Sequence, residues 1–449
     1  MVTPNNPSNQ PKVMNRWVIV VGGILIQLAL GAIYAWSAFT GPLQGTATAP
    51  SEFGFTKTET QIIFSVGLLV FAIFTIIGGR LQGKLGPMKV AMIGGTLLGL
   101  GYILASFMGV SFIGKLIFIG VLAGAGIGLA YVVPIATAVK WFPDKKGLVS
   151  GLAVAGFGFG AFIWFLLANP PSILGFRGLI ALQAGAYTVA NVDFAFLVYG
   201  IIFLILVLAG SLTMRNPPAG WKPAGWVPPQ TTTGKASAVL GCRPKEMLRR
   251  KSFYILWVMF LVGALAGLMV IGNVQNFAKD TTDGFTAYGF SSQEAIDFAV
   301  IGAAVCLPIF NGAGRIVWGQ VSDRIGRGKA LIGMFAFQAV MMAVFFYTTS
   351  NPILFYVTAA LIGFNFGGNF ALFPVSCADS FGPENLAVNY GFLFTAYGIG
   401  GIVGPILAGM VQDAGLSFLY AFIPAAAMCA IAVGLAFAYQ FGSRKIVSV

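Results

Sequence analysis

The sequence has 449 residues, of which 57% are hydrophobic and 9% are charged, and its mean hydropathy is +0.87. Because a soluble domain carries about 25% charged residues, this composition excludes a soluble globular protein and indicates a polytopic helical membrane protein. The net charge of +13 does not indicate nucleic-acid binding, since the basic residues stand in short loops between apolar segments.

The chain begins with a polar segment that contains prolines (1–15), which we expect to be a cytoplasmic tail without a cleavable signal peptide. Six apolar runs of membrane-spanning length follow, and they define an expected N-terminal six-helix bundle over residues 16–215. These runs lie near Trp17–Phe39, Gln61–Gly79, Val90–Met108, Leu116–Val139, Leu148–Leu167 and Phe194–Met214.

A polar segment over residues 216–252 separates these runs from a second set. The stretch Arg215–Lys251 is rich in basic residues, has a single acid, Glu246, and contains several prolines, so we expect a cytoplasmic linker. Six further runs define an expected C-terminal bundle over residues 253–441, which a cytoplasmic tail (442–449) follows. These runs lie near Phe253–Phe277, Ala295–Val317, Ala330–Tyr347, Ile353–Cys377, Tyr390–Met410 and Leu416–Tyr439.

The two sets of runs repeat each other at a constant offset of 240 residues. Examples of the matched positions are Gly79 with Gly319, Lys84 with Arg324, Gly86 with Gly326, Pro134 with Pro374, and Gly158 with Gly398. We therefore predict an all-α polytopic membrane protein with twelve transmembrane helices in two pseudo-symmetric six-helix bundles. Such an internal repeat is typical of a secondary transporter whose binding site lies between the halves, near the middle of the membrane.

The distribution of charge predicts the orientation of this bundle. If both termini are cytoplasmic, only Lys57, Lys115, Arg177 and Lys279 of the 26 Lys and Arg residues lie on the outer side, and Arg315 lies in the membrane. So strong a bias predicts a multi-pass protein of the cytoplasmic (inner) membrane with both termini in the cytoplasm.

The segment Asn311–Lys329 combines an intramembrane cation with a polar hairpin. Asn311 and Arg315 are four residues apart and share one helix face, and Arg315 precedes Asp323 by eight residues, roughly 12 Å along a helix. A lone arginine in the hydrocarbon costs at least about 2.5–3.5 kcal/mol, so it indicates a functional site. The hairpin and its first-half copy form a candidate gating motif, made of Gly79, Lys84, Gly86, Gly319, Asp323, Arg324, Gly326 and Arg327.

The hairpin sequence Gly319–Lys329, GQVSDRIGRGK, resembles the loop signature of the major facilitator superfamily. The first-half copy departs from that signature, because Gly83 stands where an aspartate is usual. More narrowly, the chain resembles the oxalate:formate antiporter family and its lactate- and pyruvate-carrying relatives. The motifs that carry this resemblance are Gly31–Trp36, Trp141–Gly147, Phe310–Arg315, Gly367–Pro374 and Asn389–Phe392.

This resemblance implies that Arg315 binds a substrate carboxylate inside an aromatic cage. The cage residues at matching positions are Tyr34, Tyr131, Phe366, Phe370 and Phe394. Two departures distinguish this sequence from the oxalate carrier. Phe366 and Phe370 replace a Trp and a Tyr, and Tyr397 stands where that carrier has its second cation, a lysine.

The residues themselves leave alternatives open. Arg315 could instead pair with a helix carbonyl or an acid, although no intramembrane acid is evident, and Asn311 could bind substrate or water, or join two helices. Tyr34 and Tyr131 could line a cavity or simply pack. One cation in the site favours one negative charge on the cargo, because a second carboxylate would lack a partner at a penalty on the order of several kcal/mol.

We therefore expect a monomeric carrier of small monocarboxylates such as lactate, pyruvate or formate, which works by alternating access of its two halves. Energy coupling stays open between anion exchange and symport with protons as the coupling ion. The alternatives are an oxalate/formate-type dicarboxylate exchanger and, from another class, a transporter-like carboxylate sensor. An enzyme is not expected, since the apolar runs offer no histidine, no paired carboxylates and no Ser/Lys dyad. The absence of histidine and of CxxC spacing also predicts no metal site, and no cofactor is expected.

Overall fold

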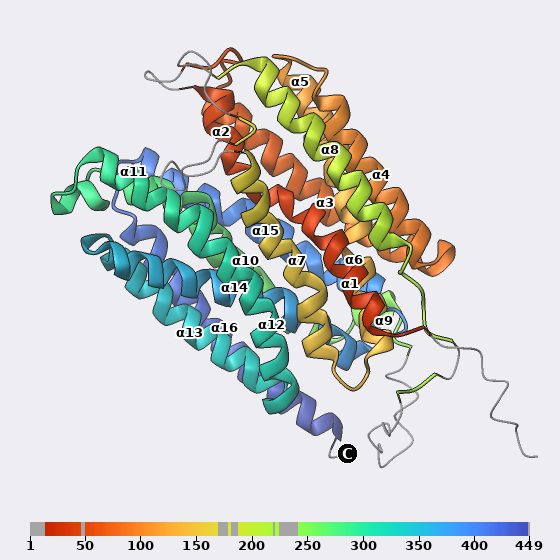
Figure 1. Ribbon diagram of the computed structural model, residues 1–449. Coiled ribbons are helices and arrows are strands. Elements are labelled where there is room, and N and C mark those ends of the chain that lie inside the picture. Colours follow the sequence, from red (N-terminus) through yellow and green to blue (C-terminus); the bar gives the residue numbers. More distant parts are fainter. Residues whose placement is uncertain are drawn as a thin grey trace, which may run out of the picture.

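The computed structural model places the helices in two bundles that lie side by side (Figure 1). It describes residues 14–45, 50–168, 178–180, 187–218, 221–223 and 241–447. Among these residues, 12 helices are long and apolar enough to cross a membrane, and the sole extended pairing is an isolated bridge between Ser51 and Tyr187. The prediction of an all-α protein with twelve transmembrane helices is confirmed.

The first half supplies six of these spans. Its helices are α1 (Trp17–Leu30), α2 (Ser37–Gln44), α3 (Lys57–Leu85), α4 (Pro87–Ala105), α5 (Phe112–Lys115), α6 (Gly124–Trp141), α7 (Lys146–Ala168) and α8 (Val189–Ser211). A 3-10 turn (Gly31–Ala35) connects α1 to α2, and a π-helical turn (Leu116–Ala123) connects α5 to α6. Most of the expected tail 1–15 and about half of the expected linker 216–252 lie outside the described residues.

The second half follows the short linker helix α9 (Pro244–Met247). Its helices are α10 (Lys251–Lys279), α11 (Ser292–Ile301), which runs through a π-helical turn (Gly302–Cys306) into α12 (Leu307–Ile325), α13 (Arg327–Phe345), α14 (Pro352–Phe381), α15 (Leu386–Asp413) and α16 (Leu419–Val447). Short 3-10 turns at Phe285–Tyr288 and Phe346–Ser350 complete it. The last helix continues to Val447, through most of the segment 442–449 expected as a tail.

Two matched glycines of the repeat form the hairpins between neighbouring helices. Gly86 separates α3 from α4 with φ +82°, and Gly326 separates α12 from α13 with φ +89°. A side chain is strained at such angles, so glycine is the residue that allows each helix to end and the next to begin at once. The repeat therefore places a glycine in both halves at the hairpin position where the backbone has a positive φ.

Glycines also set how closely the two halves approach. Helix α7 packs along α12, and α3 packs along α15. A Cβ atom at Gly158 would lie 2.6 Å from the backbone nitrogen of Gly312, and one at Gly147 would overlap the carbonyl oxygen of Gly319. The halves therefore meet backbone to backbone, as small residues permit in membrane bundles.

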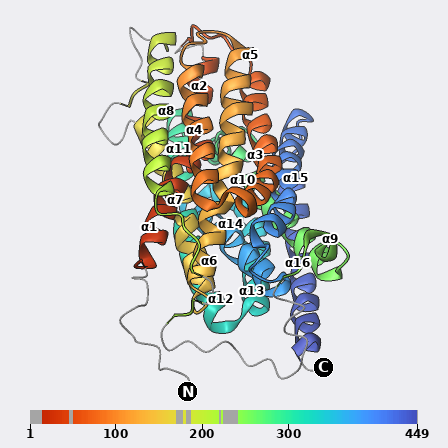
Figure 2. The ribbon, with the colours of Figure 1, turned by 90° about the vertical axis from the view of Figure 1, so that its right-hand side faces the viewer.

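The end of the bundle where α1 begins and α16 ends is called the basic end from here on (Figure 2). The hairpins at Gly86 and Gly326 and the beginnings of α7 and α15 lie at this end, because successive spans run in opposite directions.

At the opposite end, a buried ion pair joins two helices of the first half. Lys115 pairs with Asp193 of α8 and also donates a hydrogen bond of 2.8 Å to the carbonyl oxygen of Ala105. Its ammonium lies 5.3 and 4.9 Å from the ring centroids of Phe53 and Phe196. The Lys115 side chain is fully buried, so this residue, expected among the outer-side cations, holds α5 against α8.

Removing one partner of this pair should destabilise the fold more than removing both. We expect Lys115→Met to lower the free energy of unfolding by about 3–5 kcal/mol, because Asp193 would remain as a buried charge without its partner. The double variant Lys115→Met/Asp193→Leu should regain most of that loss. The free energy of unfolding of both variants is measured in detergent micelles. A double variant less stable than Lys115→Met would contradict this account.

Candidate functional site

The centre of the molecule holds a buried guanidinium. Arg315 lies on α12 with an exposed fraction of 0%. Its Nε donates a 2.8 Å hydrogen bond to the side-chain oxygen of Asn311, and its Nη1 donates a 2.9 Å hydrogen bond to the carbonyl oxygen of Val154 on α7. Its Nη2 makes no hydrogen bond, and no described acidic side chain forms an ion pair with it.

Two aromatic faces surround this charge. The guanidinium carbon lies 4.3 Å from the ring centroid of Phe370 on α14 and 5.2 Å from that of Phe157 on α7. Both rings present their negative faces to the cation, and such contacts contribute about 0.5–2 kcal/mol each. The site therefore compensates the charge of Arg315 with dipoles and rings, and it leaves one donor nitrogen without a partner.

The aromatic residues expected at the site do gather around Arg315, and they come from both halves. The hydroxyl of Tyr34 lies 2.5 Å from that of Tyr397 on α15, so one hydrogen bond joins the halves directly. The rings of Tyr131 on α6 and Phe394 on α15 also meet across the halves, with centroids 4.9 Å apart. Phe366 contacts Tyr34 at 6.2 Å between ring centroids.

Four aromatic residues of this cluster were not found from the sequence. They are Phe71 on α3, Phe157 on α7, Phe260 on α10 and Tyr390 on α15. Tyr390 had a detectable signal, since it lies seven residues before Tyr397, on the same helix face, and belongs to the motif Asn389–Phe392. The three phenylalanines stand in uniformly apolar runs and had none.

Three polar atoms of the cluster are buried without a hydrogen-bond partner. They are Nη2 of Arg315 and the hydroxyls of Tyr131 and Tyr390. The two hydroxyls contact each other, just outside strict hydrogen-bond geometry, and both interact with the guanidinium. Buried polar groups are normally paired, so Nη2 of Arg315 stands out as a charged donor without a partner, beside two hydroxyls that contact only each other and the cation.

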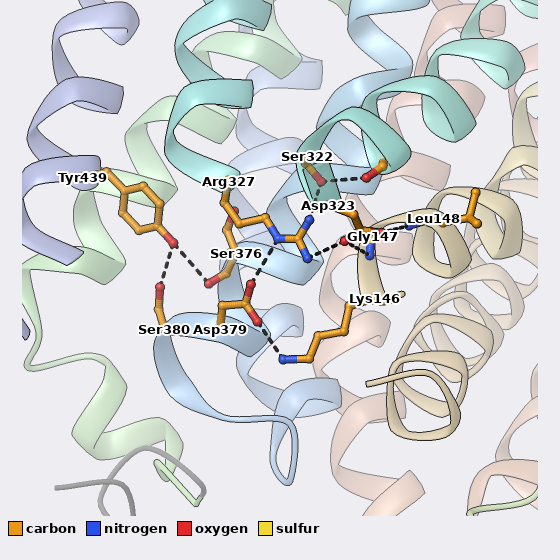
Figure 3. Close-up of polar contacts among 11 residues, drawn as sticks. Lys146, Gly147, Leu148, Ser322, Asp323, Arg327, Ser376, Asp379, Ser380 and Tyr439 are labelled. Carbon is orange, nitrogen blue, oxygen red and sulfur yellow. Dashed lines mark hydrogen bonds and ion pairs between the residues drawn. The ribbon is translucent and has the colours of Figure 1, made fainter. Parts of the chain in front are cut away.

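A second cluster closes the basic end of the interface between the halves (Figure 3). The carboxylate of Asp323 on α12 accepts hydrogen bonds from the backbone nitrogens of Gly147 at 3.0 Å and Leu148 at 2.8 Å. These are the second and third residues of α7, so Asp323 caps the N-terminus of a helix from the opposite half.

Ion pairs extend this cluster to two further helices of the second half. Arg327 on α13 pairs with Asp323 at 2.7 Å and with Asp379 on α14 at 3.1 Å. Asp379 also pairs with Lys146, the first residue of α7, at 2.7 Å. The second half thus holds the beginning of α7 by one helix cap and one ion pair.

The other residues of the candidate gating motif have distinct positions. Gly319 packs against Gly147, and Gly79 packs against the backbone of Ala387 at the start of α15. Gly86 and Gly326 form the hairpins, whereas Lys84 and Arg324 are exposed and take no part in these ion pairs. At Gly83, the position without the usual aspartate, an added Cβ would meet nothing, so the first half has no equivalent of the Asp323 cap.

Comparison with protein families and known proteins gives a consistent result. The family model described as Major Facilitator Superfamily matches residues 28–304 and 284–446. The chain is 31% identical to the uncharacterised MFS-type transporter YhjX of Escherichia coli (strain K12), over 88% of each chain. It is 30% identical to the oxalate:formate antiporter of Oxalobacter formigenes, over 87% of this chain and 83% of that one.

One more relative and one solved structure extend the comparison. The apicoplast pyruvate carrier 1 of Toxoplasma gondii is 27% identical over 84% of this chain and 81% of its own. Among solved structures, the transporter FucP in the outward conformation superposes with a TM-score of 0.64 at 15% identity, over 94% of this chain and 98% of that chain. At this identity the superposition supports the fold alone.

Proposed function

The chain belongs to the major facilitator superfamily, and from that premise we propose that this transporter carries small monocarboxylates by alternating access. The resemblance found in the sequence is confirmed by the family match, and the chain is a transporter, not an enzyme. The names of two relatives, an oxalate:formate antiporter and a pyruvate carrier, support a carboxylate as the cargo.

The observation that carries this proposal is the unpaired nitrogen of buried Arg315. A guanidinium can hold a planar carboxylate with two parallel hydrogen bonds, so a carboxylate entering the cluster would pair with Nη2 and neutralise the charge. In the described chain no other cation contacts this cluster. A monoanion would leave the site neutral, whereas a dianion would leave one charge unpaired at a cost of several kcal/mol.

The neighbouring groups fit the rest of such a molecule. The hydroxyls of Tyr131 and Tyr390, which contact each other in this structure, can turn to hydrogen-bond an oxygen next to the carboxylate, as in a 2-hydroxy or 2-oxo acid. The rings of Phe366 and Phe394 can cover a short hydrocarbon end. Lactate or pyruvate would use both features, and formate would use only the arginine.

The contacts between the halves support alternating access. Arg315 reaches Val154 across the interface, Tyr34 reaches Tyr397, and the basic end is closed by Asp323. Rocking of the halves would have to break these contacts in turn, which would open the cluster to one side and then the other. The charge distribution supports a cytoplasmic-membrane protein with its basic end inside. The coupling is exchange or proton symport, and in symport either the protonated substrate or the carboxylate of Asp379, which pairs with Lys146 and Arg327, would carry the proton.

The first prediction concerns Arg315. We expect Arg315→Gln to weaken carboxylate binding by about 100-fold or more, because a charged pair of hydrogen bonds of about 1.5–3 kcal/mol each is lost. Arg315→Lys should also bind poorly, since an ammonium lacks the planar fork. Calorimetry measures the affinity of both variants for lactate, and counterflow of labelled lactate in proteoliposomes measures their uptake. Lys329→Gln is the charge-matched control. Uptake near the wild-type level by Arg315→Gln would rule out this site.

A second prediction concerns charge selectivity. We expect Tyr397→Lys to shift uptake toward oxalate or malonate by about tenfold, because a second cation would pair with a second carboxylate. Tyr397→Phe is the control, since it removes the hydrogen bond to Tyr34 without adding charge. The comparison is labelled lactate against labelled oxalate. A wild-type protein that already prefers oxalate would overturn the proposal of a monocarboxylate cargo and favour a dicarboxylate exchanger.

A third prediction separates transport from binding. We expect Asp323→Asn to reduce the maximal uptake rate severalfold with little change in substrate affinity, because the residue acts on the closed basic end and not on the cluster around Arg315. An asparagine can still accept a hydrogen bond, so the variant loses the charge at the helix N-terminus, worth about 0.3–1 kcal/mol, and the ion pair with Arg327. Affinity from calorimetry is compared with initial uptake rates. Weakened binding at an unchanged maximal rate would contradict this role.

A further inference from the structure

A groove at the basic end lies outside the substrate cluster and outside the Asp323 network. Its volume is about 620 Å³, and it forms where the end of α3, the linker around α9 and the segment before α15 meet. Figure 2 shows α9 at this end, and α9 packs against α15. The lining residues are Arg80, Arg243, Pro244, Lys245, Glu246 and Asn385.

The lining of this groove is strongly basic. Arg80, Arg243 and Lys245 contribute three positive charges, and none of them forms an ion pair with a described residue. The one acid, Glu246, accepts a hydrogen bond of 3.1 Å from the backbone nitrogen of Arg243, so it serves the linker turn. Three unpaired cations around one cleft attract a multiply charged anion, and arginine is well suited to phosphate oxygens.

The groove also connects the two halves of the transporter. Arg80 is on α3 of the first half, directly after Gly79, which packs against Ala387 of the second half. The linker is fastened to the second half, since the carbonyl oxygen of Cys242 accepts hydrogen bonds from Asn389 at 3.0 Å and Asn385 at 3.4 Å. An anion that bridges Arg80 and Arg243 would therefore hold α3 beside α15.

We propose that this groove binds a phosphate group and that its binding stabilises the closed basic end. The phosphate is carried by an anionic lipid headgroup or by a free phosphate compound. Both sources fit a basic surface between two membrane-spanning helices, where anionic headgroups accumulate. Because the lining comes from α3 of one half and from the linker fastened to α15 of the other, an anion that bridges both favours the state in which these helices are in contact. This inference does not depend on which carboxylate the protein carries.

The test uses the full-length protein in a neutral detergent. Short-chain phosphatidylglycerol, phosphatidylcholine, inorganic phosphate and pyrophosphate are titrated separately, and binding is followed by native mass spectrometry and by the shift in unfolding temperature. The groove variant is Arg80→Gln/Arg243→Gln/Lys245→Gln. The charge-matched control is Lys145→Gln/Arg249→Gln/Lys251→Gln, which removes three exposed cations from the same end but outside the groove.

We expect the wild type and the control to bind phosphatidylglycerol and the groove variant to bind it at least about tenfold more weakly, with no such difference for phosphatidylcholine. Groove-dependent binding of phosphate or pyrophosphate, without phosphatidylglycerol, would identify a free anion as the source. If the groove variant and the control lose anion binding to the same extent, or if neither loses it, the proposed phosphate site is wrong.

A second measurement tests the link to the closed state. Asp323→Asn leaves the groove intact but loosens the basic end, so by thermodynamic reciprocity it should weaken binding of the same anion. The single variant Arg80→Gln should remove the effect of the anion on the unfolding temperature, because it is the groove's cation from the first half. An Asp323→Asn protein that binds the anion as tightly as the wild type would refute the stabilisation of the closed end.

Discussion

One guanidinium without an acidic partner determines how the interior of this protein is built. Arg315 carries a full charge in an apolar bundle, and part of its compensation comes from the opposite half, through the carbonyl of Val154 and the ring of Phe157. When the halves separate at this level, the charge must find other partners in water or in a carboxylate. Ligand binding and movement of the interface are therefore linked through the same side chain.

Much of the fold was accessible from the sequence, because a membrane helix must be long, apolar and internally hydrogen-bonded. Arg315 and the six aromatic side chains expected near it also lie together in the structure, whereas their role in binding stays a prediction. Other features of the site have no recognisable pattern in the sequence. A backbone acceptor such as Val154 has no sequence signature, and Phe71 and Phe157 are indistinguishable from lipid-facing or packing residues within apolar runs. Lys115 stood beside a loop in the sequence, yet the structure buries it against Asp193.

The two halves resemble each other in their turns but differ in how each one holds the other. The second half caps α7 with Asp323, whereas the matching position in the first half is Gly83, which has no side chain to act as a cap. The contact between α3 and α15 depends instead on Gly79 against Ala387, beside the fastened linker. A symmetric sequence repeat thus closes by two different chemistries, a carboxylate cap on one side and close packing beside a basic cleft on the other.

The backbone contacts between α7 and α12 also restrict how this protein can evolve. A Cβ at Gly151 would overlap the carbonyl oxygen of Arg315 itself, and one at Gly158 would overlap Gly312. A mutation at either position would displace the helix that carries the arginine, so it could be accepted only together with a compensating change in the other half. Lipid-facing positions can change one at a time, whereas at the contact between α7 and α12 a substitution in one half requires a matching substitution in the other.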